Sequence, residues 1–392
     1  MSAICGIIDF EKSSADFSTL RQMGRATLMR GGEKSCAYIN GGIGLMSNLG
    51  AKETETEQPL TVSLGGKNYT VLIDGEVNGV GKRSAETALE YYISFGRECF
   101  SRMDGDFALA ICDEYRGEVV LARSRGATKP LYCSFSEGKL AFCSEASGIF
   151  RFLSGGLRVD ERKLKDHILS PPAKYGAEDV YLDIDGLRDG QCAIFSKYYS
   201  NVYPCVSENF TREDNEAEYD TENIGSVEEY CIRECLSEIL FAFDYPQFDM
   251  YMPSVIALLR RAKRLEKTAL RIAEGGVSYP DVYLRERSDR LGKLCGVRFF
   301  SVSDDGAKKR NDVFKALDKS LAEQLLTCDT ALLERIFGNG IVTGVRSEKS
   351  LESRIRMTGM LIQTETLVKL YPILLCSENG IRDAYASRLS TI

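Results

Sequence analysis

The sequence has no tryptophan and only one histidine, His167, in 392 residues. A zinc site built on two histidines of one chain is therefore excluded. The run 160–169, which contains His167, is rich in charged residues and has helical character. We expect His167 to occupy a solvated position on a helix rather than to act in catalysis.

Segments that would direct the chain out of the cytoplasm are also missing. The first ten residues lack a basic region, so no secretory signal peptide is expected. The most apolar stretch, 355–375, carries Arg356, Glu365 and Lys369, which argues against a membrane span. We therefore expect a cytoplasmic protein that does not bind membranes and keeps its 13 cysteines as reduced thiols.

Basic clusters and metal-ligand patterns are scarce as well. The net charge is −7, the pI is near 5.2, and no basic run interleaved with aromatic residues occurs. Nucleic acid is therefore not expected as a partner. Cys231 and Cys235 are four residues apart on an expected helix but have no histidine neighbours. We expect this pair to pack in a core, and the sequence predicts no metal site.

The residues that are present are typical of a two-domain globular protein, with 44% hydrophobic and 27% charged residues. Residues 1–205 show strand and turn patterns, including a hairpin over 107–122. An acidic linker is expected over 206–229, and a helix-rich domain over 230–392. In that second domain the patterns predict helices at 230–241, 255–273, 312–326 and 351–375 and a lone strand at 297–302.

Six short motifs follow one another in the first 205 residues. They are Cys5–Ile8, Arg30–Gly32, Gly75–Asn78, Met103–Ala108, Lys129–Tyr132 and Cys143–Ala146. In order and spacing they resemble the glutaminase domain of glutamine-hydrolysing asparagine synthetases, a class II N-terminal-nucleophile glutamine amidotransferase domain. The resemblance covers roughly residues 3–200. It implies an α/β protein with a four-layer αββα domain, followed by a smaller, mostly helical domain related to an ATP-pyrophosphatase fold.

The resemblance makes Cys5 the nucleophile that forms a glutamyl thioester and releases ammonia. In that mechanism the thiol attacks while the free α-amine of the same residue acts as the base, so the cysteine has to begin the mature chain. Removal of Met1 would expose Ser2, and Cys5 becomes terminal only if Ser2–Ile4 are removed as well. Without this processing, we expect Cys5 to be a buried thiol in a strand.

The resemblance also implies an oxyanion hole made by an Asn-Gly-Glu motif, whose place is taken here by Asp74, Gly75 and Glu76. Gly75 can still offer its backbone N–H. An ionised Asp74 cannot donate a hydrogen bond and would repel the developing oxyanion. A protonated Asp74, kept neutral by burial, could still donate one hydrogen bond.

The groups that would bind the glutamine backbone are altered too. The resemblance places Ser47 where an arginine binds the α-carboxylate and Ser84 where an aspartate binds the α-amine. Without these charges little remains to bind the two ends of glutamine. Arg30 is kept from an Arg-Gly-Pro-Asp turn, in which Gly32 and Glu33 replace the last two residues. We therefore expect glutamine hydrolysis to be impaired.

The second domain of the synthetases that this chain resembles binds ATP and magnesium through a Ser-Gly-Gly-x-Asp-Ser loop. At the corresponding place, 240–255, the sequence has aromatic residues and no glycine, so a backbone could not approach phosphates closely. Asp244 and Asp249 in this segment could hold a metal ion or serve as caps and turns. Ser154–Asp160 contains a Ser-Gly-Gly run with no strand before it, and we interpret it as a turn. The sequence therefore requires no cofactor, although ATP and magnesium are expected for the family.

Two functional hypotheses remain open. In the first, the chain is an asparagine synthetase-like enzyme of asparagine biosynthesis, with glutamine as ammonia donor and an aspartate-like carboxylate as acceptor. In the second, it is a pseudoenzyme that acts as a binding or regulatory module, with a protein partner or as a homodimer. Ammonia release that Cys5→Ala abolishes would favour the first hypothesis. No ammonia release and no thermal shift with ATP and magnesium would favour the second.

Overall fold

The chain divides into two compact units. The computed structural model describes residues 2–11, 14–32, 34–50, 58–79, 83–153, 155–169, 180–204, 221–223, 232–265, 269–274, 288, 290–292, 294, 298–303, 311–371 and 373–376. Unit 1 consists of residues 1–155, 183–214 and 382–392, and unit 2 of residues 156–182 and 215–381. The division at 205 and 229 remains a sequence prediction, and most of the expected linker lies outside the described residues.

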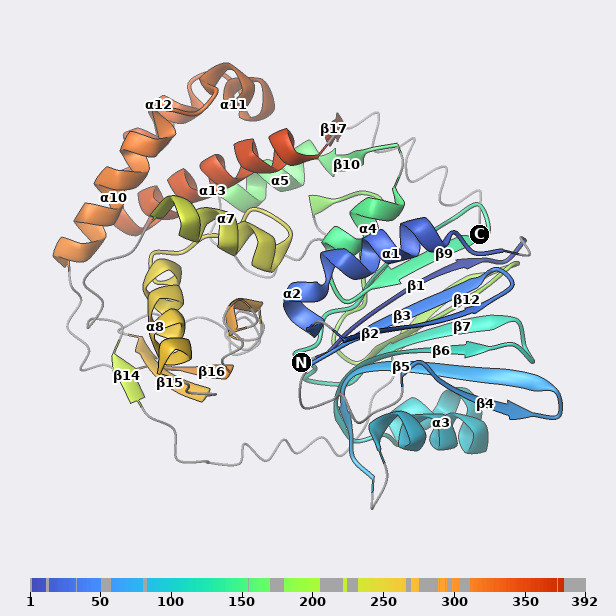
Figure 1. The fold of residues 1–392 in the computed structure, drawn as a ribbon. Helices are drawn as coiled ribbons and strands as arrows, with labels where there is room; N and C mark the ends of the chain where they lie inside the picture. Colours follow the sequence, from blue (N-terminus) through green and yellow to red (C-terminus); the bar gives the residue numbers. More distant parts are fainter. Residues whose placement is uncertain are drawn as a thin grey trace. The chain divides into compact units, whose positions relative to one another are not determined.

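Unit 1 is built on two six-stranded antiparallel sheets (Figure 1). Sheet A has the order β11-β8-β9-β1-β3-β2, with strands β1 Ala3–Asp9, β2 Lys34–Asn40, β3 Ile43–Leu49, β8 Tyr132–Ser136, β9 Lys139–Cys143 and β11 Asp185–Gly186. Sheet B has the order β13-β12-β7-β6-β5-β4, with strands β4 Leu60–Leu64, β5 Lys67–Val77, β6 Gly105–Asp113, β7 Glu118–Arg123, β12 Gln191–Ser196 and β13 Ser200–Pro204. The hairpin predicted over 107–122 is confirmed as β6 and β7.

Helices cover the outer face of each sheet. They are α1 Phe17–Ala26, α2 Leu28–Gly31, α3 Ser84–Phe95, the 3₁₀ helix η2 Gly96–Ser101 and α4 Ala146–Phe152. Helices α1 and α4 lie against sheet A, and α3 lies against sheet B (Figure 1). The start of α1 is fixed by Asp16, whose carboxylate accepts from the backbone N–H groups of Ser18 and Thr19. The four-layer αββα arrangement expected for this part of the chain is therefore confirmed.

An apolar core fills the space between the two sheets. Sheet A contributes residues such as Ile4, Ile8 and Phe142, and sheet B contributes residues such as Leu72 and Leu121. Successive side chains of a strand point to opposite faces, so the residues that alternate with these on β1 and β5 face the helices instead. This alternation decides which polar side chains meet inside unit 1.

Unit 2 is mostly helical, as expected for the second part of the chain. Its helices are α5 Glu161–Leu169, α7 Ile232–Phe243, α8 Met252–Arg264, α10 Asn311–Leu325, α11 Thr330–Phe337, α12 Ile341–Arg346 and α13 Leu351–Leu370. Helix α13 packs against α5, α7, α10, α11 and α12, which explains why apolar residues occur on all its sides. None of the helices in the described residues has both the length and the apolar character needed to cross a bilayer.

Two small parallel sheets complete unit 2. One contains β14 Thr221–Asn223, β15 Ala269–Glu274 and β16 Arg298–Ser303, and the other pairs β10 Leu157–Asp160 with β17 Ile373–Cys376. Three sequence predictions are wrong here. The helices expected over 255–273 and 351–375 end early and are followed by β15 and β17, and β16 is not a lone strand. In each case the strand is stabilised by a partner that is distant in sequence, which local patterns do not reveal.

The prediction that His167 is solvated is also wrong. The side chain is fully buried, with Nε2 2.7 Å from the carbonyl oxygen of Pro246 and the ring against Tyr245. A carbonyl can only accept, so Nε2 carries a proton. The charged residues around His167 on α5 conceal that its own face of the helix packs inside unit 2.

Candidate functional site

The start of β1 places Ser2 and Cys5 on opposite faces of sheet A. Ile4 and Ile8 lie in the core between the sheets, and Ser2 shares their alternation. The Cys5 side chain points the other way, toward the helices, where it lies beside Cys143 on β9. A residue of β1 can therefore reach sheet B from position 2 but not from position 5.

A group of buried polar side chains, which we call the Asp74 cluster, surrounds Ser2. Asp74, on β5, accepts from Arg30 Nε at 2.9 Å, and neither side chain is exposed. The hydroxyl of Ser2 donates to the same carboxylate at 3.3 Å, and that of Ser144 donates at 3.4 Å. Glu145 completes the cluster, with an oxygen 3.6 Å from Arg30 Nη1.

The backbone holds this cluster in place. Ile4 N–H donates to the Ser144 hydroxyl at 3.0 Å, and Ser144 N–H donates to the Ile4 carbonyl at 2.9 Å. These two bonds join the start of β1 to the end of β9. Arg30 is presented by the short helix α2, and a side chain at its neighbour Gly31 would come within 2.5 Å of the Asn48 carbonyl oxygen. The close approach of α2 to β3 thus requires a glycine beside Arg30.

Charge and hydrogen bonding in the cluster favour an ionised Asp74. A guanidinium at 2.9 Å stabilises the charged carboxylate, and the two hydroxyl donors act in the same direction. A neutral Asp74 that donates a hydrogen bond, the alternative left open by the sequence, does not fit this set of donors. The cluster therefore neutralises the Asp74 carboxylate. It offers no side-chain amide donor at the position where the resemblance places the asparagine of the oxyanion hole.

Gly75 and Glu76 follow Asp74 on β5. Gly75 has φ +109°, and a Cβ built on it would lie 2.0 Å from the Asp106 carbonyl oxygen on β6. The glycine is therefore required by the close pairing of β5 and β6, whatever its backbone N–H does. Glu76 lies across from Asp106 in the strand register, and its side chain is exposed.

The two serines at the predicted clamp positions bind their own chain. Ser47 is fully buried, and its hydroxyl donates to the Gln58 carbonyl at 2.9 Å. The Ser84 hydroxyl accepts from the Val77 backbone N–H at 3.1 Å, at the entry to α3. Neither hydroxyl replaces the charge that the resemblance places at its position, and the structure does not bring either one into the Asp74 cluster.

Cys5 is 1% exposed, within β1, and the pKa of its neighbour Cys143 is raised well above the ordinary thiol value, first by burial and then by Cys5. Both thiols therefore have the character of core residues. Sequence reasoning missed Ser2, the side chain of the β1 segment that does reach the cluster. The signal for it was the two-residue alternation of the strand, which separates position 2 from position 5.

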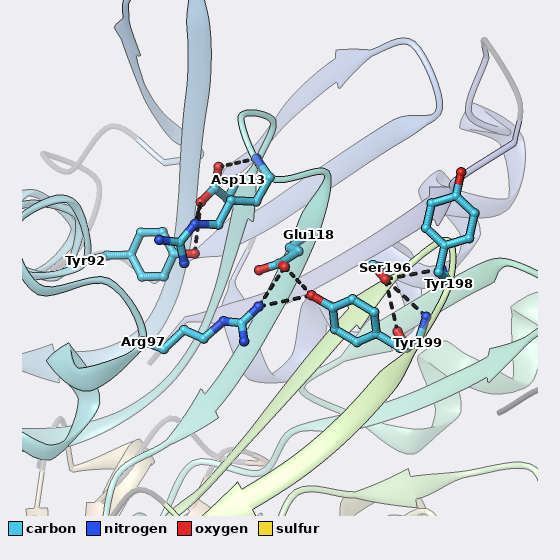
Figure 2. A network of polar contacts seen from close by, with 8 residues as sticks. Tyr92, Arg97, Asp113, Glu118, Ser196, Tyr198 and Tyr199 are labelled. Atoms are coloured by element: carbon cyan, nitrogen blue, oxygen red, sulfur yellow. Dashed lines mark hydrogen bonds and ion pairs between the residues drawn. The ribbon is translucent and has the colours of Figure 1, made fainter.

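A second polar network lies at the opposite end of β6 and β7 (Figure 2). The Glu118 carboxylate accepts from Arg97 Nη2 at 2.6 Å and from the Tyr199 hydroxyl, while Asp113 accepts from Tyr92 at 3.1 Å. Arg97 belongs to η2 and Tyr199 to the turn between β12 and β13. The network therefore fastens η2 to sheet B, away from the Asp74 cluster.

In unit 2 the two acidic residues considered as metal ligands have structural roles. Asp249 accepts from the backbone N–H groups of Tyr251 and Met252, in the turn that leads into α8. Asp244 follows α7 in a left-handed conformation, φ +63°, and its carbonyl accepts from the Tyr181 hydroxyl at 2.7 Å. Within the described residues, no three His, Cys, Asp or Glu side chains lie together as a metal site would require.

A buried arginine from elsewhere in the chain contacts the segment at which the resemblance would place a phosphate-binding loop. Arg290 is fully buried, and its Nη1 donates to the carbonyl oxygens of Ala242 and Phe243 at the end of α7. Its guanidinium lies over the rings of Phe243 and Tyr245. The C-terminal end of α7 is thus occupied by a cation of the chain itself, and the negative end of the helix dipole stabilises this cation.

Comparison with known families identifies this architecture. A family model described as a glutamine amidotransferase domain matches residues 1–203, more than half of the chain. The chain belongs to the glutamine amidotransferase domain family. The resemblance that the six motifs indicated is confirmed, and the glutamine amidotransferase domain includes the whole Asp74 cluster.

Two curated relatives are similar to part of this chain. Asparagine synthetase (glutamine-hydrolyzing) 3 of Bacillus subtilis is 24% identical over 226 residues, covering 52% of this chain and 36% of that protein. Amidase chry2 of Gibberella zeae is 30% identical over 117 residues, covering 29% of this chain and 17% of that protein. The chain therefore spans well under two thirds of the length of either relative.

Solved structures give weaker likenesses. Glutamine phosphoribosylpyrophosphate amidotransferase from B. subtilis, complexed with ADP and GMP, has 13% identity and a TM-score of 0.37, over 76% of this chain and 65% of that chain. An allosteric regulatory enzyme of purine biosynthesis has 13% identity and a TM-score of 0.38, over 79% and 67%. Likenesses at such scores carry no argument about function.

Proposed function

We propose that this chain is a glutamine amidotransferase-domain protein that releases no ammonia from glutamine and acts as a binding or regulatory module. The observation that carries the proposal is the buried ion pair of Arg30 and Asp74, to which Ser2 and Ser144 are hydrogen-bonded. The pair lies where the resemblance places one donor of the oxyanion hole.

The first argument concerns the transition state. Hydrolysis of an amide places negative charge on the carbonyl oxygen, and loss of one preorganised donor lowers the rate by about 10²–10³-fold. An ionised Asp74 removes the donor and adds a negative charge at the same place. The Gly75 backbone N–H would be left to act against that charge. Both effects increase the barrier, so glutamine hydrolysis is expected to be undetectable.

The second argument concerns binding of glutamine. The α-carboxylate and the α-amine of glutamine need opposite charges, and the positions expected to supply them are Ser47 and Ser84. Both hydroxyls are engaged with the chain itself, at Gln58 and Val77. A pair of hydroxyls gives much less than a charged clamp, because charge-assisted hydrogen bonds are about twice as strong as neutral ones.

The third argument concerns the nucleophile. Cys5 as an N-terminal nucleophile requires loss of Ser2–Ile4, which would delete both bonds between Ile4 and Ser144 and the pairing of Ala3 with Asn48. The thiol would still face the helices rather than Asp74. The same reasoning makes the asparagine synthetase-like enzyme of the first hypothesis the weaker candidate.

We also propose that the chain needs neither ATP nor magnesium. The segment 244–251 is buried, and its polar groups bind the protein itself: the Asp249 carboxylate accepts from the Tyr251 backbone N–H, and the Pro246 carbonyl accepts from His167. A nucleotide would have to displace these contacts. Amidation of an aspartate-like carboxylate, which depends on an activated acceptor, is therefore not expected of this chain alone.

The test is ammonia release from glutamine by the protein purified at its full length, with its intact mass measured first. We expect no release above the uncatalysed background and no thermal shift with glutamine or with ATP and magnesium. Cys5→Ala and Ser2→Ala should then change nothing in these assays. Ammonia release that either substitution abolishes would overturn the proposal, as would a thermal shift with ATP and magnesium.

A further inference from the structure

Position 2 is the point at which β1 meets the Asp74 cluster. Ser2 is 2% exposed, and its hydroxyl oxygen lies 3.3 Å from Asp74 Oδ1. Ser2 and Cys5 are the hydroxyl and thiol residues of the segment 2–9, and of these two Ser2 is the one that reaches sheet B, since Cys5 faces the helices. The electrostatic surroundings of position 2 therefore decide whether this end of the domain can carry reactive chemistry.

One guanidinium dominates those surroundings. Arg30 Nε binds Asp74 at 2.9 Å, and Arg30 Nη1 lies 3.6 Å from Glu145, so two carboxylates flank the same cation. Both Arg30 and Asp74 have side chains with no exposed surface, where Coulomb interactions are screened less than in water. A negative charge at position 2 would lie next to the Asp74 carboxylate and would compete with it for Arg30.

We propose that Asp74 silences position 2: its carboxylate binds the Arg30 guanidinium and the Ser2 hydroxyl, and so prevents negative charge from forming on the side chain of residue 2. Removal of this single charge leaves Arg30 available to stabilise an anion there. The inference rests on the proposed function, because it names the residue responsible for the lack of activity. It adds that the inactivity is electrostatic and local, not a collapse of the fold.

A thiol at position 2 is a direct probe of this effect. When a thiol ionises, the S–H bond breaks, the electron pair stays on sulfur and the proton goes to solvent. A neighbouring carboxylate opposes this step, and a neighbouring guanidinium favours it, each by about 1–3 pKa units at 4–6 Å. The measurement requires only proton exchange with solvent, so it does not depend on access of a larger reagent to this buried site.

The experiment compares Ser2→Cys with Ser2→Cys/Asp74→Asn in the full chain. Cysteine labelled with ¹³C at Cβ is incorporated, and the signal absent from the unsubstituted protein reports position 2. Its chemical shift is followed against pH. We expect the pKa of this thiol to be lower by at least about one unit, a tenfold change in acidity, when Asp74 is replaced. An equal or higher pKa in the double variant would overturn the proposal.

Ser2→Cys/Ser144→Ala is the matched control. Ser144 donates to the same carboxylate as Ser2 but carries no charge, so its loss should leave the position 2 thiol within a few tenths of a unit. An equal decrease in this variant would attribute the effect to packing and overturn the proposal. If Asp74→Asn does not fold, Ser2→Cys alone still tests the inference: burial and Asp74 should together hold its thiol pKa above the ordinary value of about 8.5, and a value below it contradicts the inference.

The two proposals fail in different ways. Ammonia release by the unsubstituted protein would contradict the proposed function whatever the thiol does. An unchanged thiol pKa would contradict the silencing role of Asp74 even if no ammonia is ever released.

Discussion

Asp74 and Gly75 are neighbours on β5, but their substitution tests different properties of the strand. Asp74 matters for its charge, whereas Gly75 matters for the space beside Asp106, whose carbonyl oxygen would lie 2.0 Å from an added Cβ. We expect Gly75→Ala to lower the free energy of unfolding by about 3 kcal/mol or more, through both the clash and φ +109°. Urea denaturation measures this change.

Gly65→Ala is the control for that prediction. Gly65 also has a positive φ, +57°, but nothing lies within 4 Å of its added Cβ. Its substitution should cost only the backbone term, about 1 kcal/mol. Equal losses at the two glycines would show that close pairing of β5 with β6 contributes nothing at Gly75.

Glu118 is the second residue whose charge can be tested by itself, because Arg97 and the Tyr199 hydroxyl both donate to one of its oxygens (Figure 2). The pKa of Tyr199 is raised by its hydrogen bond to Glu118 and further by burial. We expect Glu118→Gln to bring the pKa of Tyr199 back toward the ordinary value of about 10, since the negative charge that opposes the phenolate is gone. Ultraviolet titration of the phenolate, with Tyr199→Phe to identify the signal, measures it. A pKa that stays raised would contradict this cause.

The site could be predicted only in part at this scale. Asp74 and Arg30 were identified by comparison with short motifs, because those motifs keep their order along the chain, and Ser144 lies in one of the motifs without having been singled out. Ser2 was missed because the sequence motif draws attention to Cys5, while the face on which each side chain lies depends on the register with β3 and β9. His167 was missed for a related reason, since its neighbours on α5 are charged and its own contacts come from a distant segment.

At the scale of elements, Glu365 on α13 holds the start of α11. Its carboxylate accepts from the Asp329 backbone N–H at 2.7 Å and from Lys369 Nζ at 2.6 Å. Burial alone would raise the pKa of Glu365, but the hydrogen bonds from Lys369 and Asp329 outweigh it, and the pKa is lowered. The stabilisation that follows is present above the unfolded pKa of about 4.3 and is lost as pH falls through the lower folded value.

We therefore expect Glu365→Gln to destabilise the protein by about 1 kcal/mol at pH 7 and by progressively less as the pH falls below about 4. Denaturant unfolding of both proteins across this range measures the difference. The same loss at acidic and neutral pH would mean that the stabilisation does not come from the charge of Glu365.

Elements with strong local signals were predictable. The hairpin of β6 and β7 has a turn of polar residues and glycine between two apolar strands, and α3 shows helical spacing of its apolar residues. The strand β15 was not predicted, because it pairs in parallel with β14 and β16, both distant in sequence. Its residues continue the apolar pattern of α8, so local propensity gave no sign of the change.

At the scale of the whole molecule, the chain divides into two compact units, and their stabilities can be tested separately. In α13, a Cβ added at Gly359 would lie 2.4 Å from Phe248 Cδ1, and Phe248 is fully buried in unit 2. We expect Gly359→Ala to be destabilising, although alanine is the better helix former by about 1 kcal/mol.

Hydrogen exchange followed by mass spectrometry can compare Gly359→Ala with Gly75→Ala. Each variant should lose protection first in its own unit: peptides of 351–370 for Gly359→Ala and of 67–77 for Gly75→Ala. Equal loss in both regions for either variant would show that the two units unfold as one.

The layered architecture of unit 1 could be predicted because the order of motifs along a chain survives large changes in individual residues. The membership of the segment 156–182 in unit 2 could not, because it depends on contacts with parts of the chain far downstream, such as β17 with β10. The local composition of a segment does not predict pairing with a strand that is distant in sequence.

Because the segment 156–182 of unit 2 lies between two stretches of unit 1, the two units cannot be divided simply at the level of the gene. The family match ends at residue 203, but the stretch before it already contains β10 and α5, whose partners β17 and α13 come from the last part of the described chain. No single cut in the gene can separate the two units, because each unit is encoded by more than one separate stretch of the sequence. A transplant of the family-matched stretch alone, residues 1–203, would therefore carry β10 and α5 without their partners β17 and α13.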